Sequence, residues 1–297
     1  MRLRWLFTFI LFVIAVISSY FALESYAEVK LKEKLDRKLS SLPLDVTYRK
    51  FDYKLLENTV TIENLRASQL GYSIFANKII VDLPISYRKK EIPENLHLKV
   101  EGLKIPLKTP FISNFSKTLN LKEKATNFIP LDLDVSYAFD GSILKIEFLT
   151  SSPLFGELKT VSYFTNITKQ KLELLINGKA DKEYTLKRIA LAYFDLIYKD
   201  RGFIQNFLKK EAEQQGISVE EFKKKLIYTI ESNSSSESVK KKIIFPLVSF
   251  IKNPSCLEVS LKPSEPISLK DATYLLNENS EVFSLIEKLG LTLKTCN

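Results

Sequence analysis

The densest group of polar residues in the chain is Tyr198-Lys-Asp-Arg-Gly202, with Asp195 just before it. Two neighbouring carboxylates can share acid/base work, one protonated and one ionised. No nucleophile, histidine or metal ligand stands beside them in the sequence, and an aspartate directly before a helical pattern is typical of an N-cap. We therefore predict that Asp200 caps a helix, with a hydrolase-like carboxylate pair as the alternative.

Two further places carry residues that could do chemistry. Asp132 and Asp134 share one face of a predicted strand because side chains alternate with period two, which predicts a wet outer face. His97, the single histidine, lies between two leucines and is predicted to be exposed on the opposite side, with a pH sensor as the alternative. With one histidine and no Cys-x-x-Cys pair, a metal site is not expected.

No sequence motif specifies a reaction. The chain contains no Gly-x-Gly-x-x-Gly, P-loop or Gly-x-Ser-x-Gly motif. The sequence therefore predicts no catalytic residue and no cofactor, and a protein that is not an enzyme.

The two cysteines, Cys256 and Cys296, stand late in the chain. Cys256 begins one alternating run and Cys296 ends another. If these two strands pair in antiparallel fashion, the thiols come close enough to bridge, which would suit an exported domain. Two unrelated thiols remain the alternative.

Near the N-terminus, an apolar run without any charged residue extends from Trp5 to Leu23. Its length predicts a transmembrane anchor after a cytoplasmic segment of residues 1–4. A cleaved signal ending near Ser25-Tyr-Ala27 and a buried soluble helix are the alternatives. More cations follow the run than precede it, but large domains translocate largely regardless of charge, so we expect export. The predicted location is the inner (plasma) membrane, single-pass, with a cytoplasmic N-terminus and a periplasmic C-terminal domain.

Composition supports a folded chain and limits its partners. Hydrophobic residues make up 45% of the chain and charged residues 27%, with a net charge of +9. The lysines are scattered, whereas nucleic-acid binding favours clustered bases with prominent arginine, so no nucleic acid is expected. The runs Lys223–Lys225 and Lys240–Lys242 are read as solvated helix faces, with weak attraction to anionic lipid headgroups as the alternative.

The periodicity predicts an α+β chain. A juxtamembrane helix is expected over residues 24–43, then a β-rich domain over 44–185, built of antiparallel meanders that form a curved sheet. Within it we expect a helix at 111–128, a strand at 171–176 and a hairpin turn at Asn177-Gly178. Residues 186–297 are expected to be mainly helical, with a capping box at Ser218 and Glu221 and a kink at Pro246.

The first strands resemble those of a known group. The segments Leu44-Asp-Val-Thr-Tyr48, Thr59-Val-Thr-Ile-Glu-Asn-Leu-Arg66 and Ala76-Asn-Lys-Ile-Ile-Val-Asp-Leu83 resemble the start of AsmA-like and YdgA-like proteins of the Gram-negative envelope. The resemblance implies an envelope protein that contacts lipid or supports outer-membrane assembly, and it offers no catalytic residues to carry over.

The function expected from the sequence is therefore non-enzymatic. The protein would be anchored at the membrane bilayer and present a β-sheet surface or groove to lipid or to another envelope protein, in envelope maintenance. A structural adaptor that docks through its C-terminal helices and an unrecognised envelope hydrolase are the alternatives.

Overall fold

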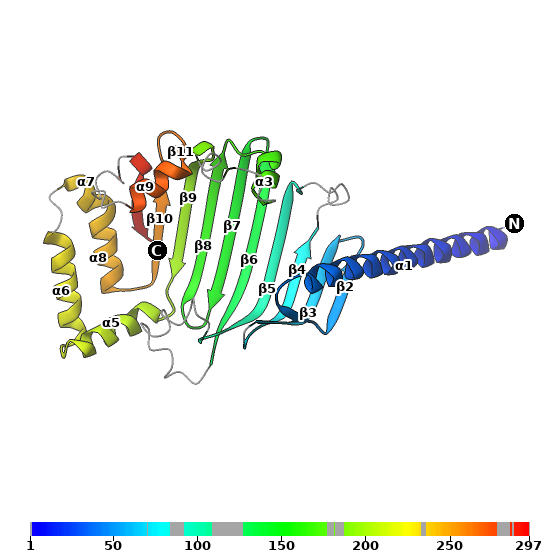
Figure 1. Cartoon of the computed structure of the whole chain (residues 1–297), viewed down its shortest axis with the longest axis horizontal. Helices are drawn as coiled ribbons and strands as arrows, with labels where there is room; N and C mark the ends of the chain where they lie inside the picture. The colour runs from blue at the N-terminus through cyan, green and yellow to red at the C-terminus, as the bar shows by residue number, and fades with distance from the viewer. Residues whose placement is uncertain are drawn as a thin grey trace.

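The structure, a computed structural model, describes residues 2–69, 71–83, 92–108, 127–176, 181, 187–232, 236–277, 286 and 288–296, with side chains from residue 16 onward except at 175–176 and 276–277. A long helix, α1 (Arg2–Ser40), leads into an antiparallel sheet and projects beyond it (Figure 1). The strands are β1 (Asp45–Thr47), β2 (Lys50–Lys54), β3 (Thr59–Gln69), β4 (Tyr72–Asp82), β5 (Asn95–Pro106), β6 (Phe128–Asp140), β7 (Ile143–Ser152), β8 (Gly156–Thr165), β9 (Ala190–Lys199), β10 (Cys256–Leu261), β11 (Ile267–Ser268) and β12 (Leu291–Thr295).

The sheet follows the chain almost strand by strand. Its order is β1-β3-β4-β5-β6-β7-β8-β9-β10-β12, with β2 paired to β3 and β11 paired to β9. Every described pairing is antiparallel, as expected when alternating segments are joined by short turns such as Asp140-Gly141. Gly141 takes a φ of 60°, which glycine adopts without strain.

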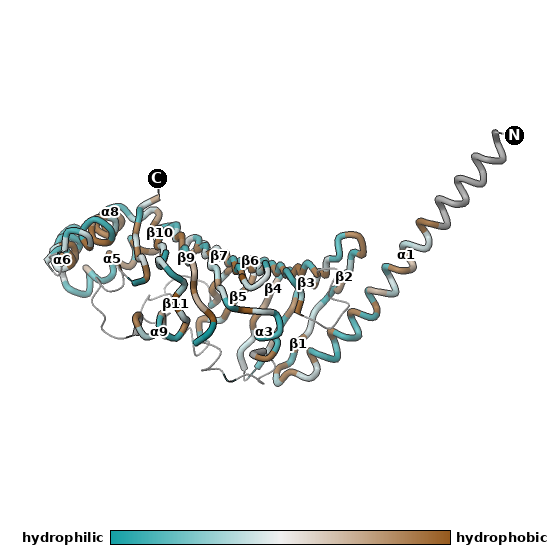
Figure 2. Tube along the Cα trace, turned by 90° about the horizontal axis from the view of Figure 1, so that it is seen from above, coloured by the Kyte–Doolittle hydropathy of each residue, from teal (hydrophilic) through white to brown (hydrophobic). Residues whose placement is uncertain are grey.

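The described helices pack on the sheet near both of its ends and, through α3 (Lys169–Ile176), on its central strands. Besides α1 and α3 they are α5 (Phe203–Gln214), α6 (Val219–Ser232), α7 (Glu237–Val239), η3 (Lys240–Ile244), α8 (Phe245–Lys252) and α9 (Leu269–Asn277). α1 packs on β1 and β2, whereas η3 and α8 pack on β12, and α9 on β9 and β11. Seen along the strands, α3 and α9 lie on the same side of the sheet (Figure 2).

Small hydrophobic cores form where helices meet the sheet. At one end Ala27, Leu31 and Leu35 of α1 pack against the buried Phe51, Tyr53, Val60 and Ile62. At the other end Val239, Ile243, Ile244 and Val248 pack with Leu291 and Leu293 of β12. The spacing of the α1 residues places one stripe of that helix against the sheet.

The predicted mainly helical C-terminal region is wrong. Within residues 186–297, β9, β10, β11 and β12 continue the sheet begun by β1 to β8, so one sheet crosses the predicted boundary. The helical periodicity of α5, α6 and α8 is real, but strand pairing between distant segments such as β9 and β10 decides the architecture. The fold is mostly antiparallel sheet with a long N-terminal helix.

The transmembrane part of the predicted fold is corrected as well. Within the described portion of the chain, the structure contains no helix that is both long and apolar enough to cross a membrane. The predicted boundary Trp5 lies among the residues whose side chains are not described, whereas Leu23 lies within α1 and is exposed. From Glu24 onward α1 is charged, and its stripe of Ala27, Leu31 and Leu35 packs on protein.

Of the smaller predictions, one is wrong, two lie wholly or mostly outside the described residues, and the kink at Pro246 stays a prediction. The predicted strand at 171–176 is wrong, because these residues lie in α3, which begins where the Thr168 hydroxyl accepts from the Lys171 backbone N–H. The predicted helix at 111–128 falls mostly outside the described residues, and Phe128 begins β6; Asn177-Gly178 also falls outside them. The π-helical stretch η3 ends at Ile244, and Pro246 lies in the first turn of α8, where proline is tolerated.

Candidate functional site

The two faces of the sheet differ sharply in polarity. One row of directly opposed residues crosses the sheet on what we call the polar face: Thr59, Asp82, His97, Ser136, Glu147, Val161, Asp195, Ser260 and Thr292. Ion pairs flank this row, including Lys99 with Glu101 (2.8 Å) and Lys145 with Glu147 (3.1 Å). This face therefore meets water at little cost.

The opposite face, the apolar face, is built from two central rows. One contains Ile79, Val100, Leu133, Thr150, Leu158 and Tyr198, and the other Val81, Leu98, Val135, Phe148, Thr160 and Leu196. Among these twelve side chains Val100 alone is buried, and the rest are partly exposed. Apolar side chains thus line the middle of the sheet without being fully covered by the described residues.

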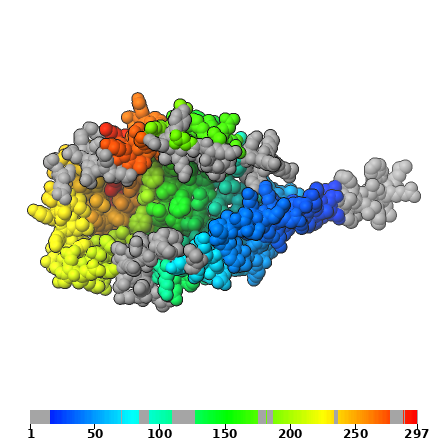
Figure 3. All heavy atoms as spheres, viewed as in Figure 1, coloured from blue at the N-terminus to red at the C-terminus, as the bar shows by residue number. Residues whose placement is uncertain are grey.

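Figure 3 shows the apolar face, where the middle strands (green) lie recessed between α1 (blue) and the C-terminal helices (yellow and orange). The side-chain hydroxyl of Thr150 on this face is shielded from solvent and has no hydrogen-bond partner within the described structure. Leaving a buried hydroxyl unpaired costs about 1–3 kcal/mol. A contiguous, partly exposed apolar surface is typical of a site that receives another molecule.

On the polar face, His97 is the centre of a cluster that joins three strands. Its Nδ1 lies 2.7 Å from Asp82 Oδ2 of β4, and its Nε2 lies 2.8 Å from Asp134 Oδ1 of β6. The Thr59 hydroxyl donates to Asp82 Oδ1 (2.9 Å) and extends the chain to β3. The prediction of a lone exposed histidine missed this cluster.

The hydrogen bond with Asp82, and then that with Asp134, raises the pKa of His97. The same bond from His97 lowers the pKa of Asp82. Both shifts favour the charged forms, as opposite charges in contact do.

The cluster does not resemble a catalytic triad. A triad needs a histidine nitrogen free to take a proton from a hydroxyl, but both nitrogens of His97 contact carboxylates and Thr59 donates to Asp82 instead. A hollow of about 270 Å³ beside it is lined by Asp82, Leu83, Asn95, Leu96, His97, Ser136, Tyr137, Ala138, Lys145 and Glu147. The arrangement fits a structural role, in which side-chain hydrogen bonds join the neighbouring strands β3, β4, β5 and β6.

The carboxylates considered for a hydrolase are not brought together. Asp195 lies on the polar face, where the Ser260 hydroxyl donates to it (2.5 Å), and Ser260 also contacts Glu258 (3.3 Å). Asp200 follows β9 and accepts from Tyr198 Oη (2.6 Å), which belongs to the apolar face. Burial, and then this bond to Asp200, raises the pKa of Tyr198.

The residues predicted as caps lie at helix starts. Asp200 accepts from the backbone N–H groups of Gly202 (2.8 Å) and Ile204 (3.0 Å), where α5 begins. Ser218 Oγ accepts from the N–H of Glu221 (3.2 Å) at the start of α6. Capping accounts for Asp200, which leaves it no evident role in chemistry.

Asp132 and Asp134 share the polar face as expected, but they are not simply solvated. Asp132 Oδ1 accepts from the backbone N–H of Gly102 (2.7 Å) at a β-bulge in β5, and Asp134 binds His97. In the described part of the chain no group of three or more histidine, cysteine or acidic residues is arranged to hold a metal ion.

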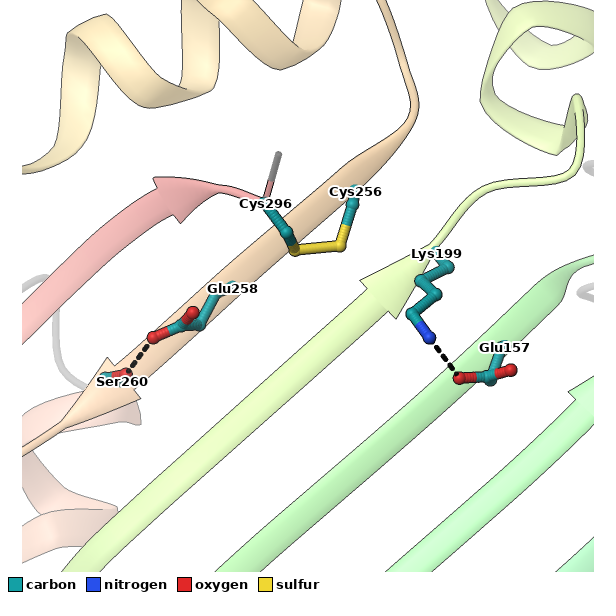
Figure 4. Close-up of a disulfide and its surroundings, with 6 residues drawn as sticks. All are labelled: Glu157, Lys199, Cys256, Glu258, Ser260 and Cys296. Atoms are coloured by element: carbon teal, nitrogen blue, oxygen red, sulfur yellow. Dashed lines mark hydrogen bonds and ion pairs between the residues drawn. A yellow bond between two sulfur atoms is a disulfide. The ribbon is translucent and has the colours of Figure 1, made fainter.

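Cys256 and Cys296 are joined by a disulfide, with their Cα atoms 5.2 Å apart. β10 and β12 pair antiparallel, with Leu257 opposite Thr295, so the start of one strand lies beside the end of the other. Figure 4 shows the disulfide on the same side of the sheet as Glu258 and as the ion pair between Lys199 and Glu157 (2.9 Å). The bond therefore fastens the last strand to the sheet.

Similar proteins give no activity. A family model described as "Uncharacterized protein" matches residues 154–295. An "Uncharacterized protein" of Aquifex aeolicus (strain VF5) is 25% identical over 220 residues, which cover 69% of this chain and 70% of that protein. The matched region 154–295 begins just before β8 and ends with β12, so it takes in both strands and helices of the C-terminal half.

Proposed function

We propose that this chain is a non-enzymatic, lipid-binding protein of the cell envelope, which holds an acyl chain against the apolar face of its sheet. The observation that carries the proposal is the pair of central rows on that face, in which all side chains except Val100 are partly exposed. A sheet normally buries its apolar face against a second layer. Here α1, η3 and α8 pack on strands near the two ends of the sheet. Helices α3 and α9 meet the central strands in the cluster around Leu144, and none of the twelve residues of the two rows belongs to that cluster.

The dimensions and chemistry of the surface suit an acyl chain. At about 4.8 Å per strand, β4 to β9 span about 24 Å, the scale of an extended lipid tail. Each methylene removed from water contributes about 0.8 kcal/mol, so even partial coverage offsets a substantial binding cost. The small side chains of Thr150 and Thr160 stand among the larger Phe148, Leu158 and Leu196 along the middle of the rows.

The envelope location is part of the proposal and has two supports. The disulfide between Cys256 and Cys296 fits an oxidising compartment such as the periplasm. The resemblance of the first strands to AsmA-like proteins points to the same compartment.

The test is lipid recovery from the purified chain, followed by loading. Organic extraction and mass spectrometry should find lipid bound, and cis-parinaric acid, a fluorescent fatty acid, should bind with enhanced emission. Thr160→Trp, which fills the middle of the apolar face, should weaken binding about tenfold or more. Lys159→Trp is the matched control, since Lys159 is the preceding residue and faces the other side. Absence of lipid together with equal binding by both variants would rule out the proposal.

An adaptor function is the second candidate. Tyr228 of α6 is 73% exposed and Phe245 of α8 is 55% exposed, and no α6 residue is buried. A partner protein bound there would protect the amides of α6 from hydrogen exchange in envelope extracts, whereas acyl-chain binding would change exchange in β5 to β9.

A further inference from the structure

The hollow beside His97, which we call the β6 hollow, forms where two small side chains of β6 stand between longer ones on the polar face. Two sets of directly opposed residues from β5, β6 and β7 line it: Asn95, Ala138 and Lys145, and His97, Ser136 and Glu147. Since alternate residues of a strand share a face, Ser136 and Ala138 leave the polar face recessed along β6. The residue sizes on three neighbouring strands therefore shape a small open site.

The charged groups of the β6 hollow have partners, whereas two uncharged groups have none. His97, Lys145 and Glu147 are all held by ion pairs of 2.7 to 3.1 Å. Within the described part of the chain, the side-chain amide of Asn95 and the hydroxyl of Ser136 make no hydrogen bond. A ligand can bond to both groups without displacing any contact of the fold, and Glu147 keeps lone pairs for a further bond.

This mixture of groups selects a class of ligand. Amide and hydroxyl groups both donate and accept hydrogen bonds, and the carboxylate accepts them, all within two strand spacings, about 10 Å. The carboxylates of Asp82 and Glu147 at the hollow disfavour phosphate and other anions. Among the described residues, no three acidic, histidine or cysteine side chains are arranged to hold a metal ion. A neutral molecule rich in hydroxyl groups can both donate to and accept from these side chains.

Aromatic rings continue the same line of residues across the sheet. Tyr163 of β8 is directly opposite Lys145, and Tyr193 of β9 is directly opposite Tyr163. The two rings meet edge to face at 5.6 Å, and the Lys145 ammonium lies 5.9 Å from the centre of the Tyr163 ring. Both tyrosines are partly exposed. A tyrosine offers an apolar ring and a polar hydroxyl at a wet surface, which suits the C–H and O–H groups of a sugar.

We propose that the β6 hollow binds one hexose unit of a neutral carbohydrate, with Asn95, Ser136 and Glu147 bonding its hydroxyl groups and the next unit lying toward Tyr163. The hollow measures about 270 Å³, just below the range of about 300–1,000 Å³ for sites of drug-sized ligands, so it suits a single sugar ring. The site lies on the face opposite the proposed acyl-chain surface and is therefore a second binding function.

Saturation-transfer difference NMR on the full, oxidised chain tests the proposal with three neutral trisaccharides: maltotriose, cellotriose and N,N′,N″-triacetylchitotriose. Saturation should reach the ring protons of at least one of them. Ser136→Trp, which fills the β6 hollow, should abolish the signal. Thr292→Trp is the matched control and should keep it, because Thr292 lies in the same polar row but on β12, at the edge of the sheet.

Asn95→Ala is a second variant that should leave the fold intact, because the Asn95 side chain makes no hydrogen bond to a described residue. It should weaken sugar binding about fivefold, as expected for one neutral hydrogen bond, at an unchanged urea midpoint. Lack of transfer to all three sugars would overturn the proposal, as would unchanged binding by Ser136→Trp and Asn95→Ala or equal loss in Ser136→Trp and Thr292→Trp.

The two proposals can fail separately. Binding of cis-parinaric acid reports on the apolar face, so an absence of sugar binding leaves the proposed function standing, and an absence of fatty-acid binding leaves the β6 hollow standing. Displacement of cis-parinaric acid by the sugar would place the sugar on the apolar face and overturn the present inference.

Discussion

Removing the disulfide is the sharpest single perturbation, because its effect follows from chain geometry. We replace both Cys256 and Cys296 by Ala, which suits the buried Cys256 better than a polar serine and leaves no free thiol. The bond closes a loop with a sequence separation of 40 residues. By the loop-entropy relation, this closure restricts the unfolded chain enough to stabilise the fold by about 4 kcal/mol at 25 °C.

That free energy translates into a measurable shift in unfolding. With a urea m value of about 3 kcal/mol/M, a loss of about 4 kcal/mol lowers the midpoint by about 1.3 M. The loss is expected to be local as well, because among the described strands β12 pairs with β10 alone and lies at the edge of the sheet. Hydrogen exchange should therefore become faster first in β12 and in the η3–α8 helix packed on it.

The assay is urea unfolding followed by circular dichroism, with and without reductant. Reductant should lower the midpoint of the natural chain to that of the double variant and leave the double variant unchanged. Equal midpoints for the oxidised natural chain and the variant would refute the reasoning, as would faster exchange confined to β1 to β4.

The remaining predictions concern single residues. Folding raises the pKa of His97, so the contribution of its charged form to stability is complete below pH about 6.5 and is lost as pH rises through the folded pKa. The stability difference between the natural chain and His97→Gln, measured by urea unfolding, should therefore shrink toward alkaline pH. A difference that stays constant with pH would contradict this. Gly156→Ala should destabilise the fold by about 3 kcal/mol or more, since a Cβ there would lie 2.0 Å from the carbonyl oxygen of Lys199 at a φ of 99°. In Gly141→Ala the added Cβ meets nothing within 4 Å, so this variant should cost about 1 kcal/mol for its positive φ alone. Similar thermal midpoints for the two variants would count against the predicted clash at Gly156. Ser218→Ala should cost about 1 kcal/mol and speed hydrogen exchange in the first turn of α6, and unchanged exchange there would count against the cap.

Much of the sheet could be predicted because its strands alternate along one short-range meander. The alternating runs that begin at Cys256 and end at Cys296 coincide with β10 and, to within one residue, with β12. The prediction of a strand at 171–176 was wrong because Lys-Leu-Glu-Leu alternates for four residues and is followed by further apolar residues, as in a strand. The Thr168 hydroxyl at the preceding turn accepts a hydrogen bond from the backbone and favours a helix instead. The extent of the sheet could not be predicted, because the pairing of β9 with β10 joins segments separated by α5, α6, α7, η3 and α8.

The His97 cluster shows a different limit. Its partners stand 15 and 37 positions away in the sequence, and only the register of β4, β5 and β6 brings Asp82 and Asp134 to the two ring nitrogens. Alternation fixes which face a side chain takes, but register fixes its neighbours, and register depends on turn lengths and on bulges such as that between Val100 and Leu103. A histidine with acidic residues at matching alternation in both neighbouring predicted strands was the available signal.

The two faces of the sheet together lead to the proposed function more strongly than either does alone. On the polar face, the charged groups of His97, Lys99 and Lys145 all have carboxylate partners, so this face can be exposed to water without a covering layer. On the other face the same strands carry leucine, valine and phenylalanine side chains that the described helices leave partly exposed. Exposed apolar area costs about 25 cal/mol per Å². Because the polar face has satisfied partners while the other face keeps this cost, the partly exposed apolar face indicates a surface that binds another molecule. Coverage by an acyl chain, which needs contact but few hydrogen bonds, removes that cost without a second protein layer.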